Sequence, residues 1–134
     1  IIPGFQEFYN WIKSKNIASI IATNSHSSGV ELTLRATGLD DMNFLSIEDF
    51  NDFGHFKPDH RAFELAAERM GLLIKECAVF EDYPANISSA KEAGAVTVAI
   101  ASEKEQGIHY NEADLIIKDY HDERLKPYIS SLLS

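Results

Sequence analysis

The sequence has little cysteine and no long apolar run. Its 134 residues include one cysteine, Cys77, so no internal disulfide can form, which is typical of a reducing compartment. No apolar stretch approaches the ~20 residues of a membrane-spanning helix. A secretory signal has a basic region followed by an apolar one, and the start of this sequence has no such pattern. We therefore expect a cytoplasmic protein with no membrane partner.

Basic residues are also scarce. Twelve lysines and arginines stand against 21 acidic residues, which gives a net charge of −9. A negative field of this size repels nucleic acid and anionic membranes, so we expect no nucleic-acid partner. A phosphate ligand would need a local cationic side chain or a metal ion.

Several motifs that identify a chemistry are absent. The chain has no Gly-x-Gly-x-x-Gly, no Gly-x-x-x-x-Gly-Lys and no Gly-x-Ser-x-Gly, which argues against dinucleotide, nucleoside-triphosphate and nucleophilic-serine chemistry. The five histidines and Cys77 lack the spacing of a zinc site. Among the aspartates, no two are separated by a single residue.

What is present is the composition of one ordinary globular domain, with 45% hydrophobic and 25% charged residues. Short apolar runs alternate with segments of helical periodicity, which predicts a parallel sheet covered by helices on both faces. The expected strands are 17–23, 43–47, 77–80, 95–100 and 114–117. The expected helices are 5–15, 30–36, 58–70, 84–93 and 123–133, and a polar surface loop is expected at 101–111.

Polar residues follow the first expected strand. Thr23, Asn24 and Ser25 offer hydroxyls and backbone N–H groups at the carboxyl end of that strand, where open α/β sheets bind ligands. Such groups can hold phosphate oxygens. The alternative is an ordinary helix cap or turn.

Two acids, Glu81 and Asp82, follow the strand expected at 77–80. A lysine, Lys57, lies in the sequence between these acids and Thr23, just before an expected helix. Glu81 and Asp82 are paired oxygen ligands of the kind that Mg²⁺ uses, although an acidic start of a helix capped by Asp82 would look the same. Lys57, before Pro58, could reach a phosphate or a carboxylate, or could simply be solvated.

Together these segments resemble the haloacid dehalogenase superfamily, in particular its class I phosphatase and phosphomutase branch, which includes β-phosphoglucomutase. The matching segments cover about three quarters of the chain and follow one another in the same order as in the family. The matching segments are Pro3-Gly4, Ile20 to Ser25, Lys57-Pro58-Asp59 with Arg61-Ala62-Phe63, Val79 to Asp82, Ala85-Asn86-Ile87 and Ala90 to Gly94.

The resemblance implies a role for each candidate residue. Thr23 corresponds to the hydroxyl that binds the transferring phosphoryl group, with the Asn24 backbone N–H beside it. Lys57 corresponds to the lysine that holds nucleophile and phosphate together, and Glu81 and Asp82 to the acids that bind Mg²⁺. Asn86 stands where the family often has glycine, which suggests a backbone position with positive φ.

One departure from the family is severe. The nucleophile and the general acid/base of the family are the aspartates of an Asp-x-Asp motif that ends the first, central strand, and this chain has no such motif. We therefore expect residues 1–134 to be the C-terminal portion of a Rossmann-like three-layer α/β/α core whose central first strand and cap are absent. The chain begins with Ile1 where the cap would end, and we interpret it as a truncated or processed member.

The function implied for the intact protein is a Mg²⁺-dependent phosphatase or phosphomutase that acts on a small phosphorylated metabolite through an aspartyl-phosphate. The chain alone should be inactive, because its nucleophile is missing. One alternative is a non-catalytic scaffold or regulatory domain that binds phosphate or Mg²⁺ without turnover. A phospho-acceptor receiver domain is disfavoured, because its acids would precede the hydroxyl and the lysine.

The missing strand also predicts a structural problem. A parallel sheet without its central strand leaves unpaired backbone groups on two inner edges. We expect either that the strands at 17–22 and 77–80 close up and pair directly, or that a partner chain fills the gap through self-association.

Overall fold

Strands and helices alternate along the chain, as the sequence predicts. A computed structural model describes residues 2–101, 110 and 112–133, so most of the loop expected at 101–111 lies outside the described residues. The additional elements are one helix and one short 3-10 helix. In order, the elements are α1 (Phe5–Ser14), β1 (Ile21–Ala22), α2 (Ser27–Ala36), β2 (Phe44–Leu45), α3 (Ile47–Phe53), α4 (His60–Arg69), η1 (Ile74–Glu76), β3 (Ala78–Glu81), α5 (Pro84–Ala93), β4 (Val96–Ile100), β5 (Leu115–Ile117) and α6 (Leu125–Leu132).

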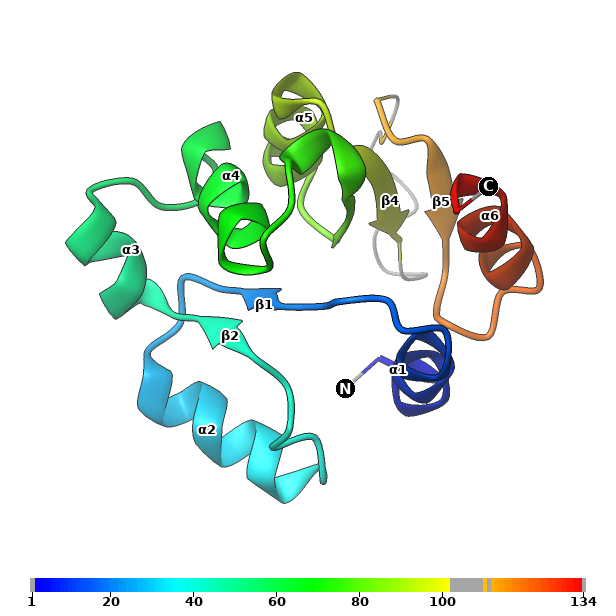
Figure 1. Ribbon diagram of the computed structural model, residues 1–134, viewed down its shortest axis with the longest axis horizontal. Coiled ribbons are helices and arrows are strands. Elements are labelled where there is room, and N and C mark those ends of the chain that lie inside the picture. Colours follow the sequence, from blue (N-terminus) through cyan, green and yellow to red (C-terminus); the bar gives the residue numbers. More distant parts are fainter. Residues whose placement is uncertain (1, 102–109, 111, 134) are drawn as a thin grey trace.

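The strands form two separate parallel sheets. β1 pairs with β2, and β3, β4 and β5 form a three-stranded sheet in that order. Figure 1 shows β1 and β2 on one side of the molecule and β4 and β5 on the other. The chain is therefore a mixed α/β fold with parallel sheets, as predicted.

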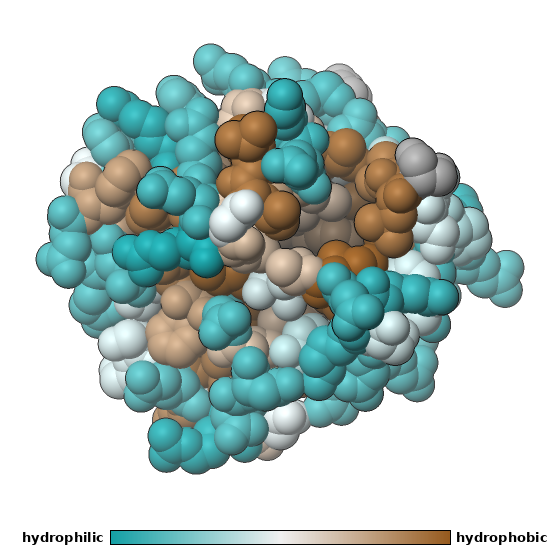
Figure 2. Space-filling model, viewed as in Figure 1, coloured by the Kyte–Doolittle hydropathy of each residue, from teal (hydrophilic) through white to brown (hydrophobic). Residues whose placement is uncertain are grey.

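The prediction that β1 and β3 pair directly is wrong. The two strands belong to different sheets, and α4 packs against both β1 of one sheet and α5, which covers the other. Side chains from both sheets, including Ile21 of β1 and Phe80 of β3, pack against one shared apolar core instead. Figure 2 shows apolar residues gathered round a hollow near the middle of this face, in the same view as Figure 1.

The three-stranded sheet is covered by helices on both faces. Val98 and Ile100 of β4 belong to the main core with residues of α1 and α6. Ala99, which points to the opposite face, packs with Ile87 of α5. Alternate residues of one strand therefore contact helices on opposite sides, which is the three-layer arrangement expected from the sequence.

Helix α3 was not predicted from the sequence. It begins directly after β2, where the carboxylate of Asp49 accepts hydrogen bonds from the backbone N–H (2.8 Å) and the hydroxyl (3.1 Å) of Ser46. Its Phe50 is fully buried beside Leu45 and α4. This capping interaction and the burial of one aromatic ring stabilise the helix. It was missed because seven residues are too few to show a clear helical repeat of apolar residues.

None of the helices in the described part of the chain combines the length and the apolar character needed to cross a bilayer.

Gly4, before α1, has no room for a side chain. Its φ is +83°, and an added Cβ would lie 2.9 Å from the carbonyl carbon of Tyr120 and 3.0 Å from the backbone nitrogen of His121. We expect Gly4→Ala to lower the free energy of unfolding by about 2–4 kcal/mol, because strained φ and overpacking each cost about 1–3 kcal/mol. Gly38→Ala is the control, since Gly38 has φ +73° and no atom within 4 Å of the added Cβ. Gly38→Ala should lower the free energy of unfolding by only about 1 kcal/mol, measured by urea unfolding. If Gly4→Ala and Gly38→Ala lower it equally, close packing around Gly4 does not contribute.

A partly exposed polar contact just before β5 makes the stability of the fold depend on pH: the Asp114 side chain is 32% exposed. The Asp114 carboxylate accepts hydrogen bonds from the Thr97 N–H (2.8 Å) and from Lys91 Nζ (2.9 Å). Burial acts to raise the pKa of Asp114, but the hydrogen bonds from Lys91 and Thr97 hold it below its ordinary value of 3.8.

Because the pKa of Asp114 is lower in the folded state, its stabilising contribution is complete above pH ~4 and is lost as pH falls through the folded-state pKa. We expect Asp114→Asn to destabilise the protein by about 1–2 kcal/mol at pH 7 and by less at pH 3. Urea unfolding at both pH values measures this. The exposed Asp40→Asn variant is the control, and its effect on the free energy of unfolding should be the same at both pH values. If Asp114→Asn also costs the same at pH 7 and pH 3, the Asp114 carboxylate is not the source of the pH dependence.

Candidate active site

Asn24 joins the loop after β1 to the loop before α4. Its side-chain Nδ2 donates a hydrogen bond to the Lys57 carbonyl oxygen at 2.9 Å, and the Lys57 N–H donates to Asn24 Oδ1 at 3.3 Å. These paired contacts bring together two segments that lie 33 residues apart in the sequence. Asn24 is thus a link between the loops as well as a candidate phosphate contact.

Lys57 reaches from this link to the end of β3. Its Nζ lies 2.5 Å from Glu81 Oε1, and the two side chains are only 12% and 11% exposed. The interpretation of Lys57 as a solvated surface lysine is therefore wrong. The sequence also allowed contact with a phosphate or a carboxylate, and the structure shows contact with a carboxylate. Desolvation makes this pair far more sensitive to substitution than a surface ion pair.

The second oxygen of Glu81 is also bonded. Asn86 Nδ2 donates to Glu81 Oε2 at 3.2 Å. The suggestion of positive φ at Asn86 is wrong, because Asn86 lies in the first turn of α5, and among the described non-glycine residues only Asn16 has positive φ. The side chain of Asn86 instead acts as a hydrogen-bond donor to Glu81.

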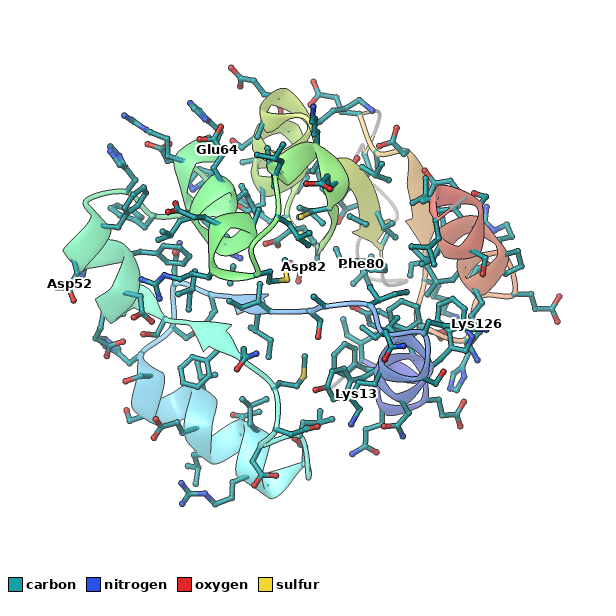
Figure 3. All side chains as sticks on the ribbon, viewed as in Figure 1. Lys13, Asp52, Glu64, Phe80, Asp82 and Lys126 are labelled. Carbon is teal, nitrogen blue, oxygen red and sulfur yellow. The ribbon has the colours of Figure 1, made fainter. Side chains whose placement is uncertain are left out.

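Asp82 directly follows Glu81, the last residue of β3. Figure 3 shows Asp82 and Phe80 near the middle of the molecule, in this view between the trace of β1 and the elements of the larger sheet. Asp82 is exposed, and within the described residues its carboxylate has no hydrogen bond or ion pair. Tyr110 Oη donates to its backbone carbonyl oxygen at 2.6 Å. The N-cap of α5 is Tyr83, so the alternative that Asp82 caps this helix is wrong.

Tyr120 lies close enough to Glu81 and Asp82 to interact with their charges. Its ring stacks on Phe80 and contacts Phe8. Burial raises the pKa of Tyr120 strongly, and the negative charges of Glu81 and Asp82 raise it further. The phenol therefore stays neutral at any ordinary pH beside the acidic pair.

Thr23 stands at the carboxyl end of β1. Its Oγ1 accepts a hydrogen bond from the Ser25 N–H at 3.1 Å, so the hydroxyl proton remains available for an oxygen ligand. The alternative that Thr23, Asn24 or Ser25 caps α2 is wrong, because the N-cap is His26 and the Ser27 N–H donates to Glu48 at 3.0 Å. Hydrogen bonds from Ser46 and from the backbone N–H groups of Glu48 and Ser27 lower the pKa of Glu48 to about 2.

The donor set fits Mg²⁺ only in part. Asp82 offers hard carboxylate oxygens of the type that Mg²⁺ binds, whereas both oxygens of Glu81 already accept hydrogen bonds. Within the described residues, no group of three or more histidine, cysteine, aspartate or glutamate side chains comes close enough together to bind a metal. Mg²⁺ usually takes one or two carboxylates and fills its other positions with water and phosphate, so this site could supply a part of its ligands.

Comparisons with known proteins identify the family of the chain. A family described as haloacid dehalogenase-like hydrolase matches residues 1–94. The chain belongs to this family. A phosphorylated carbohydrates phosphatase from Thermotoga maritima is 31% identical over 93 residues, which are 69% of this chain and 42% of that protein. The protein CbbY of Rhodobacter capsulatus is 28% identical over 121 residues, which are 89% of this chain and 53% of CbbY.

Solved structures of such hydrolases share the fold. A hydrolase from Pseudomonas syringae superposes with a TM-score of 0.80 at 25% identity, over 99% of this chain and 62% of that one. A β-phosphoglucomutase from Clostridium difficile gives a TM-score of 0.76 at 22% identity, over 98% of this chain and 56% of that one. The resemblance found in the sequence is confirmed. The haloacid dehalogenase-like chain spans about half the length or less of the curated relatives it matches.

Proposed function

We propose that the intact protein is a Mg²⁺-dependent phosphatase or phosphomutase that acts on a small phosphorylated metabolite through an aspartyl-phosphate. The observation that carries this proposal is the buried Lys57–Glu81 pair, which Asn24 ties to the loop of Thr23 and which lies next to the open carboxylate of Asp82. The similarity to a phosphorylated carbohydrates phosphatase supports a phosphorylated sugar as the substrate class.

Each residue has a task that its geometry supports. The Thr23 hydroxyl donates to a phosphoryl oxygen while its own oxygen is oriented by the Ser25 N–H. The Asn24 backbone N–H lies next in the same loop. The Lys57 ammonium neutralises developing negative charge on the transferring group, which is the main contribution an enzyme makes to phosphoryl transfer.

The local charge explains why a metal belongs to the proposal. Glu81 and Asp82 carry two negative charges against one positive charge on Lys57, in a chain of net charge −9. A phosphate dianion would be repelled from such a site without further positive charge. Bound Mg²⁺, held by Asp82 and by ligands from outside this set, would supply that charge.

The nucleophile and the general acid/base must come from outside residues 1–134, because the chain has no Asp-x-Asp pair. The chain alone should therefore not hydrolyse a generic aryl phosphate in the presence of Mg²⁺. Clear turnover that is abolished by Asp82→Ala would contradict this expectation.

The second candidate is a scaffold or regulatory domain that binds phosphate or Mg²⁺ without turnover. It is favoured by the absence of the aspartate pair. The coding sequence upstream of Ile1 separates the two candidates: an open frame with Asp-x-Asp within roughly 80–100 residues, about one small domain, favours the enzyme. A start codon at that point favours the scaffold.

Within the described residues, β1 and β3 each pair with one neighbouring strand only, and we also propose that a strand from outside this chain pairs with their other edges. In the enzyme this would be a segment of the same protein, and for the isolated chain it would be a second copy. Sedimentation of the isolated chain tests the second case: a monomer at all concentrations would argue against self-association.

A further inference from the structure

Asn86 has an unusual environment for a polar residue in a helix. It is only 9% exposed, and its backbone N–H donates to the Tyr83 carbonyl in the first turn of α5. Helical side chains lean toward the N-terminus of the helix, so its amide reaches back to the end of β3. There Nδ2 donates to Glu81 Oε2 at 3.2 Å.

Helix formation alone does not account for this residue. Asparagine has a lower helix propensity than alanine, and burying its amide is unfavourable unless the amide is hydrogen-bonded. The N-cap of α5 is Tyr83, with no side-chain capping bond, and the helix starts at Pro84. The side-chain hydrogen bond described for Asn86 thus serves Glu81 and not the end of the helix.

The contacts on Glu81 form a chain from Asn86 to Lys57. Oε2 accepts from Asn86, and Oε1 accepts from Lys57 Nζ. A carboxylate held at one oxygen can still rotate about its last side-chain bond, whereas one held at both oxygens has a fixed plane. The direction in which Glu81 presents Oε1 to Lys57 is therefore fixed by Asn86.

We propose that Asn86 is a positioning residue that fixes the Glu81 carboxylate and, through it, the Lys57 ammonium at the active site. Its catalytic meaning rests on the proposed function, but the contact chain itself can be tested without turnover.

The first test uses the ¹⁵N-labelled chain and the side-chain NH₂ signals of Asn86. Lys57→Arg keeps the positive charge but changes the group at Oε1, so it should shift these signals although residue 57 makes no direct hydrogen bond to Asn86. Lys91→Arg is the control, because Lys91 lies on the same helix and pairs with Asp114 at 2.9 Å. Unshifted Asn86 signals in Lys57→Arg, or equal shifts in both variants, would overturn the proposal.

The second test uses a protein extended through the upstream reading frame. We expect Asn86→Ala to lower kcat/KM on the order of tenfold, as is usual for groups that orient a catalytic residue. In a Lys57→Met background the same change should have no further effect, because both act through one ammonium group. An equal loss in both backgrounds would show a merely structural role. If the extended protein hydrolyses no phosphate ester, the proposed function fails, while the spectroscopic test still decides the role of Asn86.

Discussion

Lys57→Met should lower the free energy of unfolding by about 3–5 kcal/mol, since removing one partner of a buried ion pair leaves the other charge uncompensated. Glu81 is 11% exposed, and without Lys57 the one donor to its carboxylate among the described residues is the neutral amide of Asn86. Urea unfolding at pH 7 measures the loss. The double variant Lys57→Met with Glu81→Gln should recover a part of it, because no buried charge then remains.

The matched control for this prediction is Lys13→Met. Lys13 pairs with Asp41 at 2.9 Å, but these side chains are 45% and 54% exposed. Exposed pairs of this kind contribute about 0.2–1 kcal/mol. If Lys57→Met and Lys13→Met cost the same, the Lys57–Glu81 pair is not the buried link that we describe.

Asp82→Asn should have the largest effect on activity in a protein extended through the upstream frame. We expect hydrolysis of an aryl phosphate to fall on the order of 10²–10³-fold, because a metal ion contributes several kcal/mol of charge stabilisation. The change removes charge while keeping the size of the side chain. Stability should change little, since Asp82 is exposed and its carboxylate has no hydrogen bond or ion pair within the described residues.

Asp52→Asn is the control for charge alone. Asp52 is exposed and lies on α3, away from Asp82 in Figure 3. Steady-state assays over a range of Mg²⁺ concentrations should show the loss for Asp82→Asn and none for Asp52→Asn. Full activity of Asp82→Asn at the same Mg²⁺ concentration would remove Asp82 from the proposed metal site.

Much of the fold was predictable, because strong local signals agree with tertiary packing. Helix α5 runs from Pro84 to Ala93 with Gly94 at its end, as proline and glycine at those positions predict. Strands were predicted in the correct places, but all except the one at 77–80 were predicted too long: the run 17–23 pairs only over Ile21–Ala22. Apolar composition marks a buried segment, whereas pairing depends on where the neighbouring strand ends.

What the sequence could not predict depends on contacts between distant residues. Asn24, Lys57 and Glu81 were each identified, but their hydrogen bonds connect two separate loops and the end of β3. The roles of Asn86, Tyr110 and Tyr120 were missed, and only Asn86 carried a signal, as a departure from a common glycine. The two sheets are bridged by α4 and by the shared apolar core, and these tertiary contacts are not encoded in any local sequence pattern.

The central claim is that residues 1–134 carry one part of a phosphoryl-transfer site and that an aspartate from outside them completes it. The most direct measurement is aryl phosphate hydrolysis, with Mg²⁺, by the protein extended through its upstream frame and by the chain alone. We predict turnover in the extended protein, loss of turnover when the first aspartate of its Asp-x-Asp motif becomes asparagine, and no turnover in the chain alone. An extended protein that folds, carries this motif and hydrolyses no phosphate ester, or a chain that is active by itself, would contradict the account.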